Sequence, residues 1–166
     1  MRLVLLRHGE KSWLSEGGEN PLSERGSRQA LHLVELVQQG QIPRPSQIWV
    51  SPLIRTKATI APLAEAWSIP VLVKRELLLH QENETYGDFS RRVKELINSC
   101  YQDAEDFVLL ICSHQDWLME VMSYLPLAHA TIPFQSWASG QFMVFNRSPG
   151  SDRWELIGQG RLSWTT

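Results

Sequence analysis

The apolar segment Phe107–Cys112, with the sequence Phe-Val-Leu-Leu-Ile-Cys, is the feature that most restricts the fold of this 166-residue chain. A strand without polar positions has no side suited to water, so it belongs in a sheet that is covered on both faces, as parallel sheets are. Leu3–Leu6, close to the N-terminus, has the same character. The two segments predict an α/β protein in which helices cover both faces of the sheet.

Strand and helix signals alternate along the rest of the chain. Ser23 is the expected N-cap of the first helix, and Ser51 and Pro52 are the expected N-cap and first residue of the second. Leu77–Asp88 is predicted as a polar loop. The order predicts one domain over residues 1–166, a three-layer α/β/α sandwich with a mostly parallel central sheet. The further strands are predicted at 48–50, 71–73, 141–145 and 154–157, and the helices within 23–40, 51–67, 89–100 and 116–124.

Composition narrows the class of partner. The net charge is −2, so no global field favours nucleic acid or an anionic membrane, and we expect neither as a partner. The two cysteines, Cys100 and Cys112, are expected to be reduced thiols of a cytoplasmic protein. The apolar run at Leu3–Leu6 is too short for the core of a signal peptide, and no later stretch approaches a membrane span. Nothing in the sequence points to a particular oligomeric state.

Histidine and arginine follow three of the predicted strands directly. Arg7 and His8 come after the first strand, His114 comes just after Phe107–Cys112, and Arg55 lies one turn into the helix after the second strand. The carboxyl ends of parallel strands meet at one edge of a sheet, where α/β proteins gather their chemistry. These side chains therefore predict a cationic pocket. A neutral imidazole is a nucleophile near neutral pH, and arginine forks fit phosphoryl oxygens, so the chemistry favoured is phosphoryl transfer.

Each of these signals has a plainer explanation when it is taken alone. Arg-His-Gly is a tripeptide that arises by chance, and a histidine that opens a helix is commonly only a cap. Ser-Pro before a helix is usually no more than a start signal. The order and placement of the signals together are harder to obtain by accident.

Taken together, the motifs resemble the histidine phosphatase superfamily, the phosphoglycerate mutase-like group that also contains acid phosphatases. The short bacterial phosphohistidine phosphatases (SixA-like) are similar to this chain in size. The matching pieces occur in the family's order: 5–10 (Leu-Leu-Arg-His-Gly-Glu), 20–26 (Asn-Pro-Leu-Ser-Glu-Arg-Gly) with Gln29-Ala30, 51–56 (Ser-Pro-Leu-Ile-Arg-Thr) and 111–114 (Ile-Cys-Ser-His).

The resemblance implies a role for each matched residue. His8 would be the nucleophile that becomes phosphorylated, and Arg7, Arg55 and His114 would bind the phosphoryl group around it. Gly9 would allow a close backbone approach, and a carbonyl there would hold the other ring nitrogen of His8. The reaction would use no metal and no cofactor, because these side chains supply the positive charge.

Two departures from the family pattern bear on the site. Many members place a polar phosphate ligand six positions after the nucleophile, where this chain has Leu14, so Lys11 or Ser12 would have to supply that contact. Lys11 and Trp13 are candidate substrate contacts, with loop or core packing the alternative for Trp13. The second departure concerns the general acid, usually a carboxylate after the third strand. Here Glu82 is our candidate among Glu76, Glu82 and Glu84, the others being expected at the surface.

Three functions stay open at this point. The short chain offers little lid, which favours a phosphoprotein or phosphohistidine substrate. A phosphorylated small molecule is the alternative, handled by a metabolite phosphatase or a mutase-like phosphotransferase. The third is an inactive relative that binds phosphorylated ligands, and the presence of Arg7, His8, Arg55 and His114 together argues against it.

Overall fold

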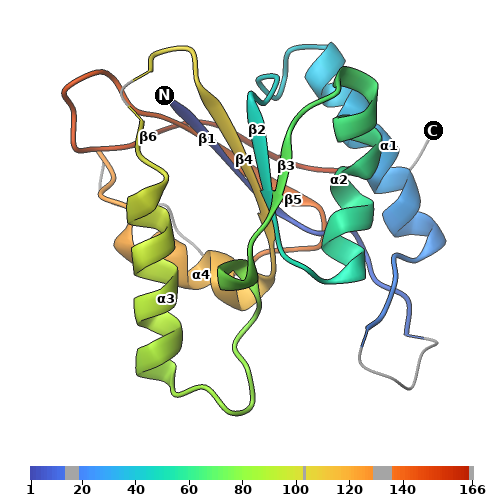
Figure 1. Ribbon diagram of the computed structural model, residues 1–166. Coiled ribbons are helices and arrows are strands. Elements are labelled where there is room, and N and C mark those ends of the chain that lie inside the picture. The colour runs from blue at the N-terminus through green and yellow to red at the C-terminus, as the bar shows by residue number, and fades with distance from the viewer. Residues whose placement is uncertain (14–18, 103, 129–135, 165–166) are drawn as a thin grey trace.

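The computed structural model describes residues 1–13, 19–102, 104–128 and 136–164. Strands and helices alternate along the chain up to the last two strands (Figure 1). A single 3₁₀ turn, η1, follows the third strand at Arg75–Leu77. The strands are β1 (Arg2–Arg7), β2 (Gln47–Val50), β3 (Val71–Val73), β4 (Val108–Ser113), β5 (Gln141–Asn146) and β6 (Glu155–Arg161), and the helices are α1 (Glu24–Gln38), α2 (Ile54–Trp67), α3 (Tyr86–Ser99) and α4 (Gln115–Tyr124).

The six strands form one sheet in the order β3-β2-β4-β1-β5-β6. β1, β2, β3 and β4 are mutually parallel, and β5 is antiparallel to both of its neighbours. In register, Arg7 of β1 lies beside Ser113 of β4, and Cys112 lies beside Val50 of β2. The segments that follow β1, β2 and β4 therefore leave the sheet at the same edge, as the sequence analysis predicted for the carboxyl ends of parallel strands.

Alternate residues of the central strands supply the cores on the two faces of the sheet. Leu3 and Leu5 point into a core with α3 and α4, while Val4 and Leu6 point into a second core with α1 and α2. Figure 1 shows the two pairs of helices on opposite sides of the sheet. Because β4 is fully buried along its length, its all-apolar sequence is accounted for, and the predicted three-layer sandwich is confirmed.

Three predicted boundaries were wrong, one of them the end of the last strand, which runs to Arg161 instead of ending at residue 157. Helix α2 begins at Ile54, after Leu53, so Ser51 is not its N-cap and Pro52 is not its first residue. The reason is that the hydroxyl of Ser51 is buried against the ring of His114 instead. The predicted loop Leu77–Asp88 is also shorter than expected, because Thr85 caps α3 and the helix starts at Tyr86.

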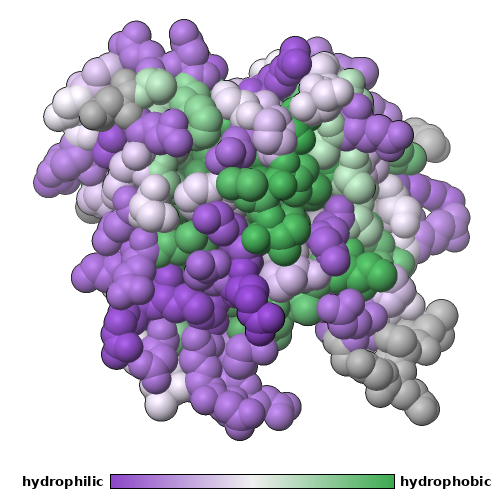
Figure 2. Space-filling view, viewed as in Figure 1, coloured by the Kyte–Doolittle hydropathy of each residue, from purple (hydrophilic) through white to green (hydrophobic). Residues whose placement is uncertain are grey.

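Figure 2 shows an apolar patch in the middle of one face, over the region of β3, whose Leu72 and Val73 are exposed.

Cys100 and Cys112 are buried and not joined to each other. Burial raises the pKa of the Cys100 thiol to about 12, so it is inert near neutral pH. Over the described ranges, none of the helices has the length and apolar character needed to cross a membrane.

Candidate active site

The backbone of His8 continues the edge of the sheet just beyond β1. Its N–H donates to the carbonyl of Ser113 at 3.1 Å, and its carbonyl accepts from the N–H of Gly140 at 3.0 Å. The ring is buried, and Nδ1 lies 2.7 Å from the carbonyl oxygen of Gly9. A carbonyl only accepts, so Nδ1 carries the proton and Nε2 presents its lone pair to the site. The expected contact between the His8 ring and a neighbouring carbonyl is present.

The loop after His8 is held by neighbours from α1 and α2. The N–H of Gly9 donates to the hydroxyl of Thr59 at 3.0 Å, and the N–H of Glu10 donates to the side-chain carbonyl of Gln29 at 2.8 Å. Gln29 is fully buried and also donates to the carbonyl of Leu162 at 3.1 Å. The glycine-containing motif around Gly26 and Gln29 thus packs against the loop after His8, which explains its spacing from His8.

Arg55 lies between the two histidines. It comes from the first turn of α2, where the chain returns to the sheet edge after β2, and it is 6 % exposed. Its Nε donates to Nε2 of His8 at 3.3 Å, and its Nη2 donates to Nδ1 of His114 at 3.3 Å. A guanidinium only donates, so both histidine nitrogens are acceptors in this arrangement. The sequence placed Arg55 at the same edge, and the structure brings it into contact with both rings.

His114 is the N-cap residue of α4, directly after β4. Its Nδ1 accepts from Arg55, so its proton lies on Nε2, which is 2.8 Å from the hydroxyl of Ser51. The rings of His8 and His114 have centroids 5.3 Å apart. Sequence analysis did not assign Ser51 to the site, because Ser-Pro was taken as a helix start.

Arg7 approaches the same space from the end of β1. Its Nη1 donates to the carbonyl of Trp137, while its Nε is buried with no acceptor among the described residues. Burial, together with the nearby charges of Arg161 and Arg55, lowers the pKa of Arg7. A guanidinium stays charged in proteins, so Arg7 keeps a buried N–H donor and a positive charge for an anion.

Both histidines are held neutral. Burial first, and then the charges of Arg55 and Arg7, lower the pKa of His8 to about 3, against the opposing bond to Gly9. Burial and the neighbouring His8 and Arg55 lower the pKa of His114 to about 2. At neutral pH the positive charge near the two rings therefore comes from Arg7, Arg55 and Lys11, and the His8 imidazole is in its neutral form.

These residues line a cavity of about 250 Å³ at the edge of the sheet. Four of its lining residues were not predicted: Gln115, Asp116 and Met119 from α4, and Leu79 from the loop after β3. Asp116 lies only two residues beyond His114, and an acidic residue in the first turn of a helix commonly serves the helix itself. The full lining is Arg7, His8, Lys11, Arg55, Leu79, His114, Gln115, Asp116 and Met119.

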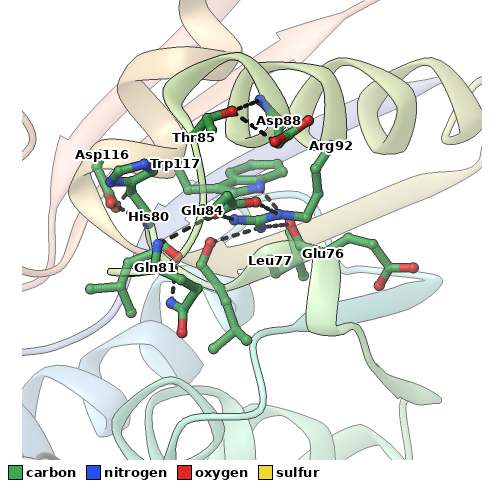
Figure 3. Close-up of polar contacts among 12 residues, drawn as sticks. Glu76, Leu77, His80, Gln81, Glu84, Thr85, Asp88, Arg92, Asp116 and Trp117 are labelled. Atoms are coloured by element: carbon green, nitrogen blue, oxygen red, sulfur yellow. Dashed lines mark hydrogen bonds and ion pairs between the residues drawn. The ribbon is translucent and has the colours of Figure 1, made fainter.

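The loop between η1 and α3 is fixed from α3 (Figure 3). Arg92 pairs with the carboxylate of Glu84 at 2.7 Å and donates to the carbonyls of Glu76 and Leu78. The bond to Arg92, outweighing the effect of burial, lowers the pKa of Glu84. The carboxylate of Glu84 is thus engaged by Arg92 in stabilising the loop, so Glu84 is not a candidate for proton transfer.

The candidate acid Glu82 lies on the same loop. It lines a cavity of about 490 Å³ that also includes Lys11 and Arg55, and so adjoins the histidine cavity. Glu76 is exposed, and among the described contacts it serves the loop through its backbone carbonyl, which accepts from Arg92 and from the Trp117 ring. Of the three carboxylates weighed as the acid, Glu82 is the one beside the cavities.

Lys11 and Trp13 lie further along the segment that follows His8. Lys11 lines both cavities, and its ammonium group stands 4.2 Å from the centre of the Trp13 ring. Trp13 is 80 % exposed and is not part of either cavity's lining. Leu14, at the position where many relatives have a polar phosphate ligand, lies outside the described residues. In the part of the chain that is described, no three histidine, cysteine or acidic side chains are grouped so as to hold a metal ion.

Comparison with solved structures shows the same fold in several phosphatases. The protein histidine phosphatase SixA in complex with tungstate is 18% identical, with a TM-score of 0.68, and the match covers 99% of this chain and 97% of that one. A putative phosphohistidine phosphatase SixA from Agrobacterium tumefaciens is 21% identical, with a TM-score of 0.71 and coverage of 96% and 97%. A putative alpha-ribazole-5'-P phosphatase from Escherichia coli is 21% identical, with a TM-score of 0.75 and coverage of 100% of both chains.

Comparison with curated protein sequences gave no match. The family model described as histidine phosphatase superfamily (branch 1) matches residues 3–79, the part of the chain that contains Arg7, His8 and Arg55. The remaining residue of the predicted set, His114, reaches the same cavity from β4. Over residues 3–79 the chain is therefore similar to the histidine phosphatase superfamily, and its sheet and helices have the phosphoglycerate mutase-like fold.

Proposed function

We propose that the protein is a phosphatase that hydrolyses a phosphomonoester or a phosphohistidine through a covalent phosphohistidine on His8. The observation that carries the proposal is the state of the His8 ring. Nδ1 is bonded to the Gly9 carbonyl, and the lone pair of Nε2 accepts from Arg55 in a cavity that Arg7 and Lys11 also line. A neutral nucleophile held next to fixed positive charge is the arrangement that displacement at an anionic phosphorus centre requires.

Binding of the phosphoryl group would change the partners of Arg55. In the ligand-free site its donors are taken by Nε2 of His8 and Nδ1 of His114. Phosphoryl oxygens are stronger acceptors than neutral imidazoles, so Arg55 would turn its fork to them and release both nitrogens. Arg7 would add the buried Nε–H that has no acceptor among the described residues. The charge of the bound group would also favour a proton on His114, which would then donate to a phosphoryl oxygen.

Two displacements complete the reaction. First, the Nε2 lone pair of His8 forms a bond to phosphorus while the bond to the leaving group breaks, and its electron pair departs with that group. Second, a water oxygen bonds to phosphorus, the P–N bond breaks and its electron pair returns to Nε2. We propose Glu82 as the acid that protonates the leaving group and then accepts the proton of the water. An imidazole leaving group, as in phosphohistidine, needs less help from an acid than an alkoxide does.

The substrate class is proposed on the openness of the site. Lys11 and Arg55 belong both to the histidine cavity and to the adjoining one under the loop, so the phosphate site opens into a larger space. This supports a bulky or protein-borne phosphate, as the name of the SixA structures suggests for those proteins. Short length does not decide the matter, since the Escherichia coli chain matched over its full length is named for a small-molecule phosphate. A cytoplasmic location stays a prediction.

Hydrolysis of p-nitrophenyl phosphate in the presence of a chelator tests the proposal. We expect the wild type to be active, the His8→Ala variant to be inactive, and a His32→Ala control on α1 to retain activity. A rapid alkaline quench should capture the phosphoryl group on His8. Activity that survives in His8→Ala would refute the mechanism, and activity lost in chelator would refute metal independence. A wild type that binds phosphate but turns over neither the aryl phosphate nor a phosphohistidine peptide would indicate a binding module.

A further inference from the structure

A second cavity, of about 520 Å³, lies on the other side of Asp116 and Met119 from the phosphate cavity. These two residues line both spaces, so the second cavity adjoins the one that contains His8. None of the residues assigned to phosphate binding or to catalysis lines this space. Its lining is His80, Tyr86, Phe89, Asp116, Met119, Glu120 and Ser123.

Three rings surround one side of the second cavity. The centroid of the His80 ring lies 5.3 Å from that of Phe89 and 6.5 Å from that of Tyr86, and the Tyr86 and Phe89 centroids are 6.2 Å apart. Tyr86 is 65 % exposed and Met119 is 42 % exposed, although both are large apolar side chains. A group of aromatic faces open to a cavity is an environment that attracts organic cations.

Glu120 supplies a negative charge to the same cavity. The residue is 7 % exposed, and its carboxylate accepts from the hydroxyls of Tyr86 and Ser90, the latter at 2.6 Å. Burial acts to raise the pKa of Glu120, but hydroxyl donors from Ser90, Tyr86 and Tyr124 outweigh it and lower the pKa, so the carboxylate is ionised at neutral pH. The ion pairs found among the described residues do not include Glu120.

The charged side chains near Glu120 do not neutralise its carboxylate. Arg92, whose guanidinium stands 5.1 Å from the centre of the Phe89 ring, is engaged by Glu84 (Figure 3). Asp116 adds a second carboxylate to the cavity wall, and its Oδ2 accepts from the backbone N–H of His80. A buried carboxylate held by neutral hydroxyls carries a desolvation cost that a bound cation would offset.

We propose that this second cavity is a cation subsite, which binds an ammonium or guanidinium group of the phosphorylated substrate. The proposal rests on the proposed function for the position of the phosphoryl group at His8. It predicts a substrate with opposite charges at its two ends, the phosphoryl group among Arg7 and Arg55 and the cation among Tyr86, Glu120 and Asp116. The same chemistry is offered by a small quaternary ammonium or by a basic side chain next to a phosphorylated residue in a peptide.

Two matched pairs of substrates test the charge alone. Phosphocholine and 3,3-dimethylbutyl phosphate have the same shape and differ in a positive nitrogen against a neutral carbon. The second pair is a phosphohistidine peptide with lysine beside the phosphorylated residue and the same peptide with norleucine there. We expect the cationic member of at least one pair to have a kcat/KM about tenfold higher in the wild type. A preference within the first pair identifies a small-molecule source, and one within the second pair alone identifies a peptide.

Variants then assign the preference to the cavity. In Glu120→Gln the ratio within the preferred pair should fall close to one, and in Tyr86→Leu it should fall about threefold. Glu95→Gln, which removes one negative charge from an exposed position on α3, the helix that carries Tyr86, should leave the ratio unchanged. Tyr86 is mostly exposed, so Tyr86→Leu is expected to fold even if Glu120→Gln does not. Equal kcat/KM values within both pairs, or an unchanged ratio in a folded Glu120→Gln, would overturn the proposal.

Titration calorimetry with the same four compounds separates this inference from the proposed function. If p-nitrophenyl phosphate is not hydrolysed, the proposed function fails, but the binding constants within each pair can still be compared. Tighter binding of a cationic member that is lost in Glu120→Gln or Tyr86→Leu would support the subsite without turnover. Equal binding within both pairs would overturn it whether or not the enzyme is active.

Discussion

The guanidinium of Arg55 donates from Nε to Nε2 of His8 across 3.3 Å, so the nitrogen proposed as the nucleophile is hydrogen-bonded to a cation before any ligand arrives. The bond stabilises the neutral ring and fixes its direction. It also means that a phosphoryl group has to compete with His8 and His114 for the donors of Arg55. On the proposed function, we therefore expect the charge and the forked geometry of this side chain both to contribute to binding and to rate.

Replacing Arg55 by lysine keeps the charge and removes the fork. We expect kcat/KM for an aryl phosphate to fall about 100-fold, because a single ammonium cannot serve several phosphoryl oxygens in the transition state. Steady-state kinetics check this, with Arg75→Lys, at an exposed position, as the matched control. A loss of less than threefold would show that the fork of Arg55 does not contact the phosphoryl group.

Ser51→Ala tests the orientation of His114. The Ser51 hydroxyl is the partner of Nε2 on that ring, and both groups are buried, so its removal leaves a ring nitrogen without a described acceptor. We expect a tenfold decrease in kcat/KM, on the order of 1.4 kcal/mol, and a similar loss of stability. Nitrogen-15 chemical shifts of the His114 ring should show a mixture of tautomers in the variant. A ring that keeps a single tautomer, with unchanged activity, would contradict this role for Ser51.

Acid should destabilise the native state through the two histidines. Their pKa values in the folded protein are about 3 and about 2, below the ordinary value of 6.5, so between pH 6.5 and pH 3 the unfolded chain binds protons that the native state does not. The free energy of unfolding therefore falls as the pH falls, by up to about 1.4 kcal/mol per pH unit for each histidine. Urea unfolding between pH 7 and pH 5 measures the slope before most carboxylates titrate.

The matched variants for this measurement are His8→Asn and His114→Asn. Each variant should reduce the slope of the free energy of unfolding against pH by the contribution of the histidine that it lacks, because asparagine does not titrate. A slope that is the same in the wild type and in both variants would show that these rings are protonated as readily in the folded protein as in the unfolded chain.

The framework of the site could be predicted because it follows from local sequence. All-apolar segments such as Leu3–Leu6 and Phe107–Cys112 fit only a sheet covered on both faces, and parallel strands bring the residues after them to one edge. His8 and His114 each follow such a strand, so their meeting required no knowledge of the loops. Arg55 was predicted for the same reason, even though the start of its helix was placed two residues too early.

The features that were missed depend on contacts between distant segments. In the sequence, Ser51 followed by proline looks like the start of a helix, whereas in the structure its hydroxyl contacts the ring of His114. Which of the two roles Ser51 has depends on where His114 lies, and the local sequence does not show that. Asp116 and Glu120 are ordinary polar residues of a helix until α3 and the loop before it are placed against them. The end of the polar loop was misplaced because Thr85, a capping residue, was not recognised before the apolar residues of α3.

Gly26→Ala should separate the loop after His8 from the helix that supports it. A Cβ at Gly26 would lie 2.0 Å from the carbonyl oxygen of Glu10, far inside contact distance, and the obstacle is backbone that cannot rotate away. Helix α1 and the loop after His8 would have to move apart, which weakens the bond from Glu10 to Gln29. We expect a loss of about 1–3 kcal/mol in the free energy of unfolding. Because small displacements of reacting groups are costly, kcat should fall about tenfold or more.

The control for Gly26→Ala is Gly87→Ala, in the first turn of α3. A Cβ there would meet only the hydroxyl of Thr85, at 3.9 Å, and alanine favours the helix by about 0.5–1 kcal/mol over glycine. The same substitution is therefore expected to destabilise the protein at one position and to be neutral or stabilising at the other. Urea unfolding and the kcat for an aryl phosphate, measured on both variants, check the pair. Equal effects at the two positions would mean that the close approach of Gly26 to Glu10 does not position His8.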